Sequence, residues 1–257
     1  MRRWPLGARF FTLLTCSSLF LSASAHKPAP PDSSPPDDPV LRAVVQLVAV
    51  GPAGREQNQE CSATGFLINE EGYLITNAHV VENARRCLEK APGAKILAKV
   101  AVTNSRIAEA VPCDVVALDL PNDLALLKLE RPLPAAAGRN PPYATLDARP
   151  VPAGVVVRVT GHPVFSWQPV TQTGQVVWVG KTRLDETEVN STFSDALEID
   201  VHLRPGNSGS PIYRPGGGAI GVVDRRNTLR PDRTFAVAIH YALELAQRNG
   251  VSWHSAE

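Results

Sequence analysis

The 257-residue chain has no excess of charge of either sign, because 26 lysines and arginines are offset by 25 aspartates and glutamates. It also contains no block of basic residues of the kind that binds nucleic acids or anionic membrane surfaces. Beyond residues 1–25 it has no apolar run long enough to cross a bilayer. We therefore expect no nucleic-acid partner and no membrane span, and polypeptides are the expected partners.

Metal-binding patterns are missing as well. The chain contains 4 cysteines and 6 histidines, but no pair of them has the spacing of a metal-ligand motif. The sequence therefore predicts no metal site and no cofactor.

The N-terminal region differs in composition from the rest of the chain. Its basic start and the apolar stretch that follows, residues 1–25, have the pattern of a secretory signal peptide cleaved after Ala25. A lipoprotein site at Cys16 is the weaker alternative, because the apolar region continues past that cysteine. Residues 26–39 are rich in proline and charge and cannot bury apolar surface, which predicts a disordered linker. We expect an exported protein, periplasmic or extracellular.

Short apolar runs separated by Gly, Pro, Asn and Asp make up most of the remaining chain. Such runs predict an all-β barrel or sandwich. Near the end, residues 235–239 predict a last strand and 241–249 a helix that Gly250 ends. We expect one domain over residues 40–250, followed by a tail, 251–257. The clearest apolar runs are 43–50, 96–102, 115–118 and 154–159.

Three segments carry the residue types of nucleophilic catalysis in the order His79, Asp123, Ser208. A serine hydroxyl is a poor nucleophile at neutral pH, so an imidazole must take its proton and a carboxylate must hold the ring in one tautomer. Glycines beside Ser208 would let the amides of Gly206 and Ser208 act as oxyanion donors. The three segments read TNAHVV at 76–81, NDLALL at 122–127 and GNSGSP at 206–211.

These segments, with VTGHP at 159–163 and TGQVV at 173–177, resemble the trypsin-like serine proteases and are most similar to the bacterial HtrA/Deg proteases. The resemblance implies an all-β fold of two six-stranded antiparallel β-barrels with a C-terminal helix. It also implies a hydrolase that cleaves peptide bonds through a His-Asp-Ser triad and an acyl-enzyme intermediate. HtrA proteases usually continue into a PDZ domain, which the last residues, 251–257, leave no room for. The alternative is a protease-fold binding or scaffold protein with a blocked active site.

Signal cleavage would leave three cysteines, Cys61, Cys87 and Cys113. The resemblance to trypsin-like enzymes implies a disulfide between Cys61 and Cys87 around the histidine loop, with Cys113 as a buried thiol. Three reduced, buried cysteines are the alternative.

The resemblance also implies a substrate pocket in the second barrel. Its walls would be the residues shortly before Ser208, the next strand around 222–225 and the last strand around 235–238. No carboxylate is clearly placed at the pocket floor, so we expect small or medium apolar residues before the cleaved bond. Asp224, Arg225 and Arg226 are interpreted as a solvated strand end, although an arginine turned inward would favour acidic residues instead. The candidate pocket residues are His202, Leu203, Val222, Val223, Asp224, Ala236 and Ala238.

Overall fold

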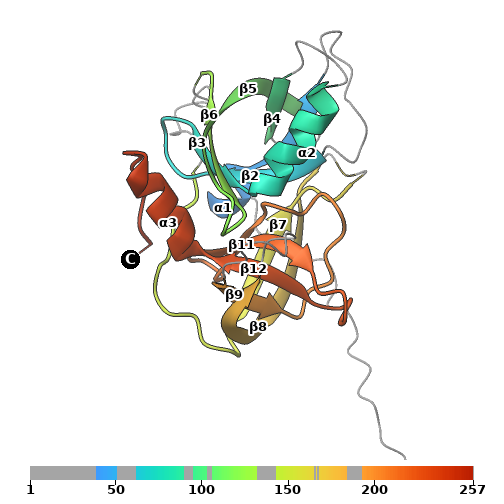
Figure 1. The fold of residues 1–257 in the computed structure, drawn as a ribbon, viewed down its shortest axis with the longest axis vertical. Coiled ribbons are helices and arrows are strands. Elements are labelled where there is room, and N and C mark those ends of the chain that lie inside the picture. The colour runs from blue at the N-terminus through green and yellow to red at the C-terminus, as the bar shows by residue number, and fades with distance from the viewer. Residues whose placement is uncertain are drawn as a thin grey trace, which may run out of the picture.

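The protein folds into two closed, six-stranded antiparallel β-barrels, one above the other in Figure 1. This computed structural model describes residues 39–50, 62–89, 95–102, 106–131, 143–164, 166, 168–183 and 193–256. The two-barrel prediction is confirmed. The expected signal peptide, nearly all of the expected linker and Cys61 lie outside the described residues.

The first barrel has the strand order β1-β2-β3-β6-β5-β4. Its strands are rich in Val, Ile, Leu and Ala, which suit a pleated and buried surface. A short helix, α1 (Pro39–Ala43), leads into this barrel. The strands are β1 (Val44–Val50), β2 (Ser62–Leu67), β3 (Tyr73–Thr76), β4 (Lys95–Val102), β5 (Arg106–Asp119) and β6 (Leu124–Leu129).

The second barrel has the strand order β10-β11-β12-β9-β8-β7. Its first strand therefore pairs with β10, which closes the sheet without leaving an exposed edge. The strands are β7 (Val156–Gly161), β8 (Val170–Arg183), β9 (Phe193–Ile199), β10 (Pro211–Tyr213), β11 (Ala219–Arg226) and β12 (Thr234–Ala238).

Two longer helices lie against the barrels. Helix α2 (Ala78–Glu89) begins just after β3 and carries His79 in its first turn. This helix was not expected from the sequence. The predicted C-terminal helix is present as α3 (Ile239–Arg248), and Gly250 follows it with a φ of 67°. α3 packs on β6 of the first barrel and on β11 and β12 of the second, so it spans the junction (Figure 1).

The residues after α3, expected only as a tail, pack back on the domain. The Leu146 amide donates to the His254 carbonyl at 2.8 Å, and the Ala256 amide donates to the Leu146 carbonyl at 2.9 Å. The His254 ring stacks on Tyr143. In the described part of the chain, no helix is both long and apolar enough to span a membrane.

Candidate active site

His79 and Asp123 lie next to the ends of two neighbouring strands of the first barrel, β3 and β6. β3 and β6 are paired antiparallel, so the end of β3 lies beside the start of β6. Helix α2, with His79, follows the end of β3, and the turn that contains Asp123 precedes β6. The side-chain amide of Asn77 donates to the Asp123 carbonyl at 3.0 Å and ties these two segments together. This pairing explains why two residues far apart in sequence meet.

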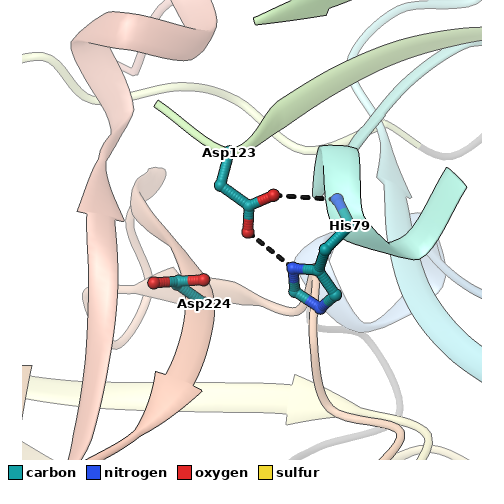
Figure 2. Close-up of side chains that lie close together, drawn as sticks. All are labelled: His79, Asp123 and Asp224. Carbon is teal, nitrogen blue, oxygen red and sulfur yellow. Dashed lines mark hydrogen bonds and ion pairs between the residues drawn. The ribbon is translucent and has the colours of Figure 1, made fainter. Parts of the chain in front are cut away.

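The Asp123 carboxylate binds His79 through both of its oxygens. Oδ1 accepts the His79 amide at 2.8 Å, and Oδ2 lies 2.5 Å from the ring nitrogen Nδ1 (Figure 2). Because Nδ1 faces a carboxylate, it carries the proton, and the second ring nitrogen, Nε2, stays available as a base. Burial lowers the pKa of His79, but the hydrogen bond and charge of Asp123 outweigh it, so the pKa lies above its ordinary value of 6.5.

Ser208 stands in the turn between β9 and β10, and this turn is hydrogen-bonded onto the first barrel. The Thr64 amide of β2 donates to the Ser208 carbonyl at 2.9 Å, and the Thr64 hydroxyl donates to the Gly206 carbonyl at 2.8 Å. A Cβ atom at Gly209 would lie only 2.0 Å from the Thr64 carbonyl oxygen. The turn therefore needs glycine beside the serine because it is pressed against β2.

The Ser208 hydroxyl donates to the backbone carbonyl of Asp224 at 3.3 Å. Among the described residues, no hydrogen bond joins it to His79, although both side chains line one cleft. The amides of Gly206 and Ser208 have no hydrogen-bond acceptor within the described ranges. Their assignment as oxyanion donors stays a prediction, and within the described residues no internal acceptor competes for them.

A cleft of about 510 Å³ contains all three predicted triad residues. Of the predicted pocket residues, Leu203, Val223 and Asp224 line it, whereas His202, Val222, Ala236 and Ala238 do not. Several arginines that the sequence analysis did not assign to the site are also present. The lining residues are Ala78, His79, Glu82, Asn83, Arg86, Leu120, Asp123, Leu203, Arg204, Pro205, Asn207, Ser208, Val223, Asp224, Arg225, Arg226 and Thr234.

The interpretation of Asp224 as part of a solvated strand end is wrong, because only 3% of this residue is exposed. The pairing of β11 with β12 shifts register between Val223 and Arg225, so Asp224 sits at a β-bulge. A bulge changes the direction of the side chains that follow it, and Asp224 is the last of the six successive buried residues at the start of β11. Burial first, and then the charge of Asp123, raise the pKa of Asp224 to about 8.

His79, Asp123 and Asp224 form one cluster in which one ring nitrogen of the histidine and one oxygen of each carboxyl group lie within 4.8 Å of one another. Histidine and carboxylates at such distances are also a pattern seen in divalent-cation sites. Here Nδ1 of His79 is engaged with Asp123, and the Arg225 guanidinium contacts Asp224 through Nε at 2.8 Å. The cluster thus has internal partners, and we assign no metal ligand.

The cysteines follow the expected division as far as the described residues extend. Cys87, on α2, is in a disulfide. Cys113, on β5, is a buried free thiol, and burial raises its pKa to about 12. Cys61 lies outside the described residues, so its pairing with Cys87 stays a prediction.

A comparison with sequence families gives one match, described as a trypsin-like peptidase domain, over residues 63–222. Among curated proteins, a relative from Halomonas elongata named "Probable periplasmic serine endoprotease DegP-like" is 27% identical over 202 residues. That alignment covers 77% of this chain and 37% of the relative. A protein of the same name from Chlamydia pneumoniae is 30% identical over 175 residues, covering 66% of this chain and 30% of the relative. The chain thus spans about a third of the length of these relatives.

Solved structures share the fold at low sequence identity. The active form of the Rv3671c protease from M. tuberculosis superposes with a TM-score of 0.64 at 19% identity, covering 88% of this chain and 90% of that one. The HtrA-type protease AlgW with a tripeptide gives a TM-score of 0.60 at 23% identity, covering 81% of this chain and 60% of that one.

Proposed function

Because the chain belongs to the trypsin-like peptidase family, we propose that it is a serine endopeptidase in which His79, Asp123 and Ser208 form the catalytic triad. The observation that carries the proposal is the two-point contact between Asp123 and His79 in the cleft that Ser208 also lines. Its substrates are polypeptides, since the cleft is lined by residues of both barrels and the curated relatives are named endoproteases.

In this mechanism the Ser208 hydroxyl leaves the Asp224 carbonyl and donates to Nε2 of His79. Oγ attacks the substrate carbonyl carbon while Nε2 takes its proton, and Asp123 stabilises the imidazolium. The negatively charged oxygen of the tetrahedral intermediate accepts hydrogen bonds from the backbone amides of Gly206 and Ser208. The C–N bond then breaks as His79 protonates the leaving amine, and water, deprotonated by His79, hydrolyses the acyl ester on Ser208.

We further propose that the first substrate side chain before the cleaved bond lies against Leu203 and Val223, the buried apolar residues of the cleft. Export to the periplasm is part of the same proposal. It rests on the signal-like residues 1–25 and on curated relatives that are named periplasmic.

A scaffold or binding protein with a latent site is the second candidate, favoured by the hydrogen bond that holds the Ser208 hydroxyl on Asp224 instead of His79. Catalytic hydrogen bonds are often long or misaligned before substrate binds, so this contact does not exclude turnover.

Fluorophosphonate labelling of the purified protein separates the two functions. We expect one covalent adduct on Ser208, hydrolysis of a casein substrate, and loss of both in Ser208→Ala, with a fall in rate of several orders of magnitude. Ser255→Ala, which changes an exposed serine outside the cleft, is the control and should label like the parent. A protein that neither labels nor cleaves, with or without substrate peptides present, would reject the enzyme and favour the scaffold.

A further inference from the structure

A second buried carboxyl group lies beside the His79–Asp123 pair. Asp224, from the second barrel, points toward the space between Asp123 and the His79 ring (Figure 2). The ligand atoms of the three residues are within 4.8 Å of one another, and Asp224 is almost fully buried. The triad chemistry described above uses only one carboxylate and leaves the part played by Asp224 unexplained.

The hydrogen-bond partners differ between the two carboxyl groups. Asp123 accepts two N–H donors from His79, one from the backbone and one from the ring. Asp224 accepts the Arg225 Nε–H through its Oδ2 atom, at 2.8 Å. Two buried carboxylates this close cannot both stay ionised without a large penalty, so the pair retains one proton. Because Asp123 has donors on both oxygens, the proton belongs on Asp224.

We propose that Asp224 is a positioning residue: its neutral carboxyl group donates a hydrogen bond from Oδ1 to the Asp123 carboxylate and keeps that carboxylate turned toward His79. The proposal rests on the triad function above. The Oδ1 atom is the donor because Oδ2 already accepts from Arg225. The β-bulge at Asp224 is what allows the strand to present this side chain to the other barrel.

The arrangement predicts a loss of function at alkaline pH. The charged groups facing Asp224 are Asp123 from the turn before β6, His79 from α2 and Arg225 from its own strand. The β12 residues paired around the bulge, Phe235 and Ala236, carry no charge. Once Asp224 ionises, two carboxylates repel each other and the hydrogen bond to Asp123 is lost. The raised pKa of Asp224 places this change above neutral pH.

Asp224→Asn and Asp224→Ala test the role, because an asparagine amide can donate to Asp123 without titrating. We expect Asn to keep kcat/KM within about three-fold of the parent at pH 7 and to remove the alkaline loss attributed to Asp224. We expect Ala to lower kcat by about ten-fold or more at pH 7 with a smaller change in KM, as expected for a lost hydrogen bond to a charged group. An Asn variant that retains the parent's alkaline loss, or a folded Ala variant with parental kcat, would overturn the proposal.

A spectroscopic readout separates this inference from the proposed activity. Infrared difference spectra of Ser208→Ala, recorded while the pH is raised from 6 to 10, should show a protonated carboxyl band that disappears. The same band should be absent from the double variant with Asp224→Asn. Its absence from Ser208→Ala would reject the inference even if the parent enzyme is active. Its presence in a parent protein that never labels would reject the triad function and leave the shared proton in place.

Discussion

Asp123 has an unusual backbone for a residue with a side chain. Its φ is 49°, and no other non-glycine residue in the described ranges has a positive φ. Asp and Asn tolerate this left-handed conformation better than most residues, and strained conformations of this kind gather at functional sites. Here the conformation ends the turn before β6 with the carboxylate aimed at His79, while the Asp123 amide still bonds the Leu120 carbonyl at 3.1 Å.

The raised pKa of His79 predicts the acid side of the activity profile. A protonated imidazole cannot take the serine proton, so kcat/KM should fall as pH falls through a value above 6.5. Asp123→Ala removes the hydrogen bond and the charge that raise this pKa, so the His79 pKa should drop. NMR titration of His79 in Ser208→Ala, with and without Asp123→Ala, measures both values. A His79 pKa unchanged by Asp123→Ala would contradict the ion pair.

At this scale the sequence predicts residues that motifs mark, and it misses those that only packing selects. His79, Asp123 and Ser208 stand in recognisable segments, and the structure brings the first two into contact and the third into the same cleft. Asp224 adjoins Arg225 and Arg226, so its neighbours suggest a solvated strand end. Its burial depends on a register shift against β12, which no local pattern reveals.

Among the elements, β2 holds the nucleophile turn through one residue, Thr64. Its amide and hydroxyl donate to the Ser208 and Gly206 carbonyls, and its hydroxyl accepts the His162 amide at 2.9 Å. Its own carbonyl accepts the Thr76 hydroxyl at 2.7 Å. Thr64 was not recognisable as a site residue from the sequence, because threonine is common in β-strands whatever their function.

Thr64→Val should lower kcat more than it changes KM. Valine keeps the size of the side chain and the backbone hydrogen bonds but removes the hydroxyl that donates to the Gly206 carbonyl. Without that hydrogen bond, the neighbouring amides of Gly206 and Ser208 are held less firmly in place as oxyanion donors. A loss of about 1 to 3 kcal/mol of transition-state stabilisation, roughly 5- to 160-fold in kcat, is expected from a buried group left without its partner. Steady-state kinetics on a peptide substrate measure the effect, and Thr64→Ser, which keeps the hydroxyl, should retain most of the activity. Equal losses in both variants would assign the effect to packing.

The disulfide on α2 gives a second prediction at the scale of elements. When the protein without residues 1–25 is denatured without reductant and alkylated, only Cys113 should be labelled, and peptide mapping should recover Cys61 joined to Cys87. The native protein should alkylate slowly at Cys113, because that thiol is buried and its pKa is about 12. In the chain-entropy treatment the bridge contributes about 3 kcal/mol of stability, so Cys87→Ser should unfold earlier in guanidinium. Recovery of Cys113 in a disulfide would overturn this pairing.

The whole molecule presents a cleft that has buried apolar side chains beside the buried Asp123 and Asp224, and exposed arginines at its rim. Leu203 and Val223 are buried within it, whereas Arg86, Arg204 and Arg226 are exposed along it. Exposed charges at the mouth of a cleft attract oppositely charged ligands, and salt weakens that attraction. For the proposed protease we therefore expect a preference for apolar side chains inside the cleft and for acidic residues farther along the bound peptide.

A peptide-library profile should show cleavage after Val, Ala, Leu or similar residues, with broad selectivity, because one methylene changes discrimination by only about 1 to 3 kcal/mol. Acidic residues at flanking positions should raise kcat/KM at low salt. Arg204→Gln should reduce that gain by up to about five-fold, as an exposed charge does, whereas Arg230→Gln, outside the cleft, should not. A profile with Glu or Asp dominant before the cleaved bond would reject the apolar pocket.

The overall architecture was predicted correctly from the sequence, whereas one of its helices was not. Runs of apolar residues between turn residues gave an all-β fold, and the resemblance gave two barrels, both confirmed. Helix α2 was missed because its first turn lies inside the histidine motif, where the apolar Ala78, Val80 and Val81 look like the end of a strand. Val222 and Ala236, which the sequence placed in the substrate pocket, are not among the residues that line the cleft. Alternation along a strand predicts two faces but not which of them meets the other barrel.

The attachment of the Ser208 turn to Thr64 has a consequence for the order in which the protein refolds. Each barrel can close its own sheet, but the hydrogen bonds that shape the nucleophile turn form only when the second barrel docks on β2 of the first. After dilution from denaturant, far-ultraviolet circular dichroism should therefore recover before fluorophosphonate reactivity does. The delay between the two signals would measure how long the two barrels take to dock, so the rate of labelling would report the last step of folding.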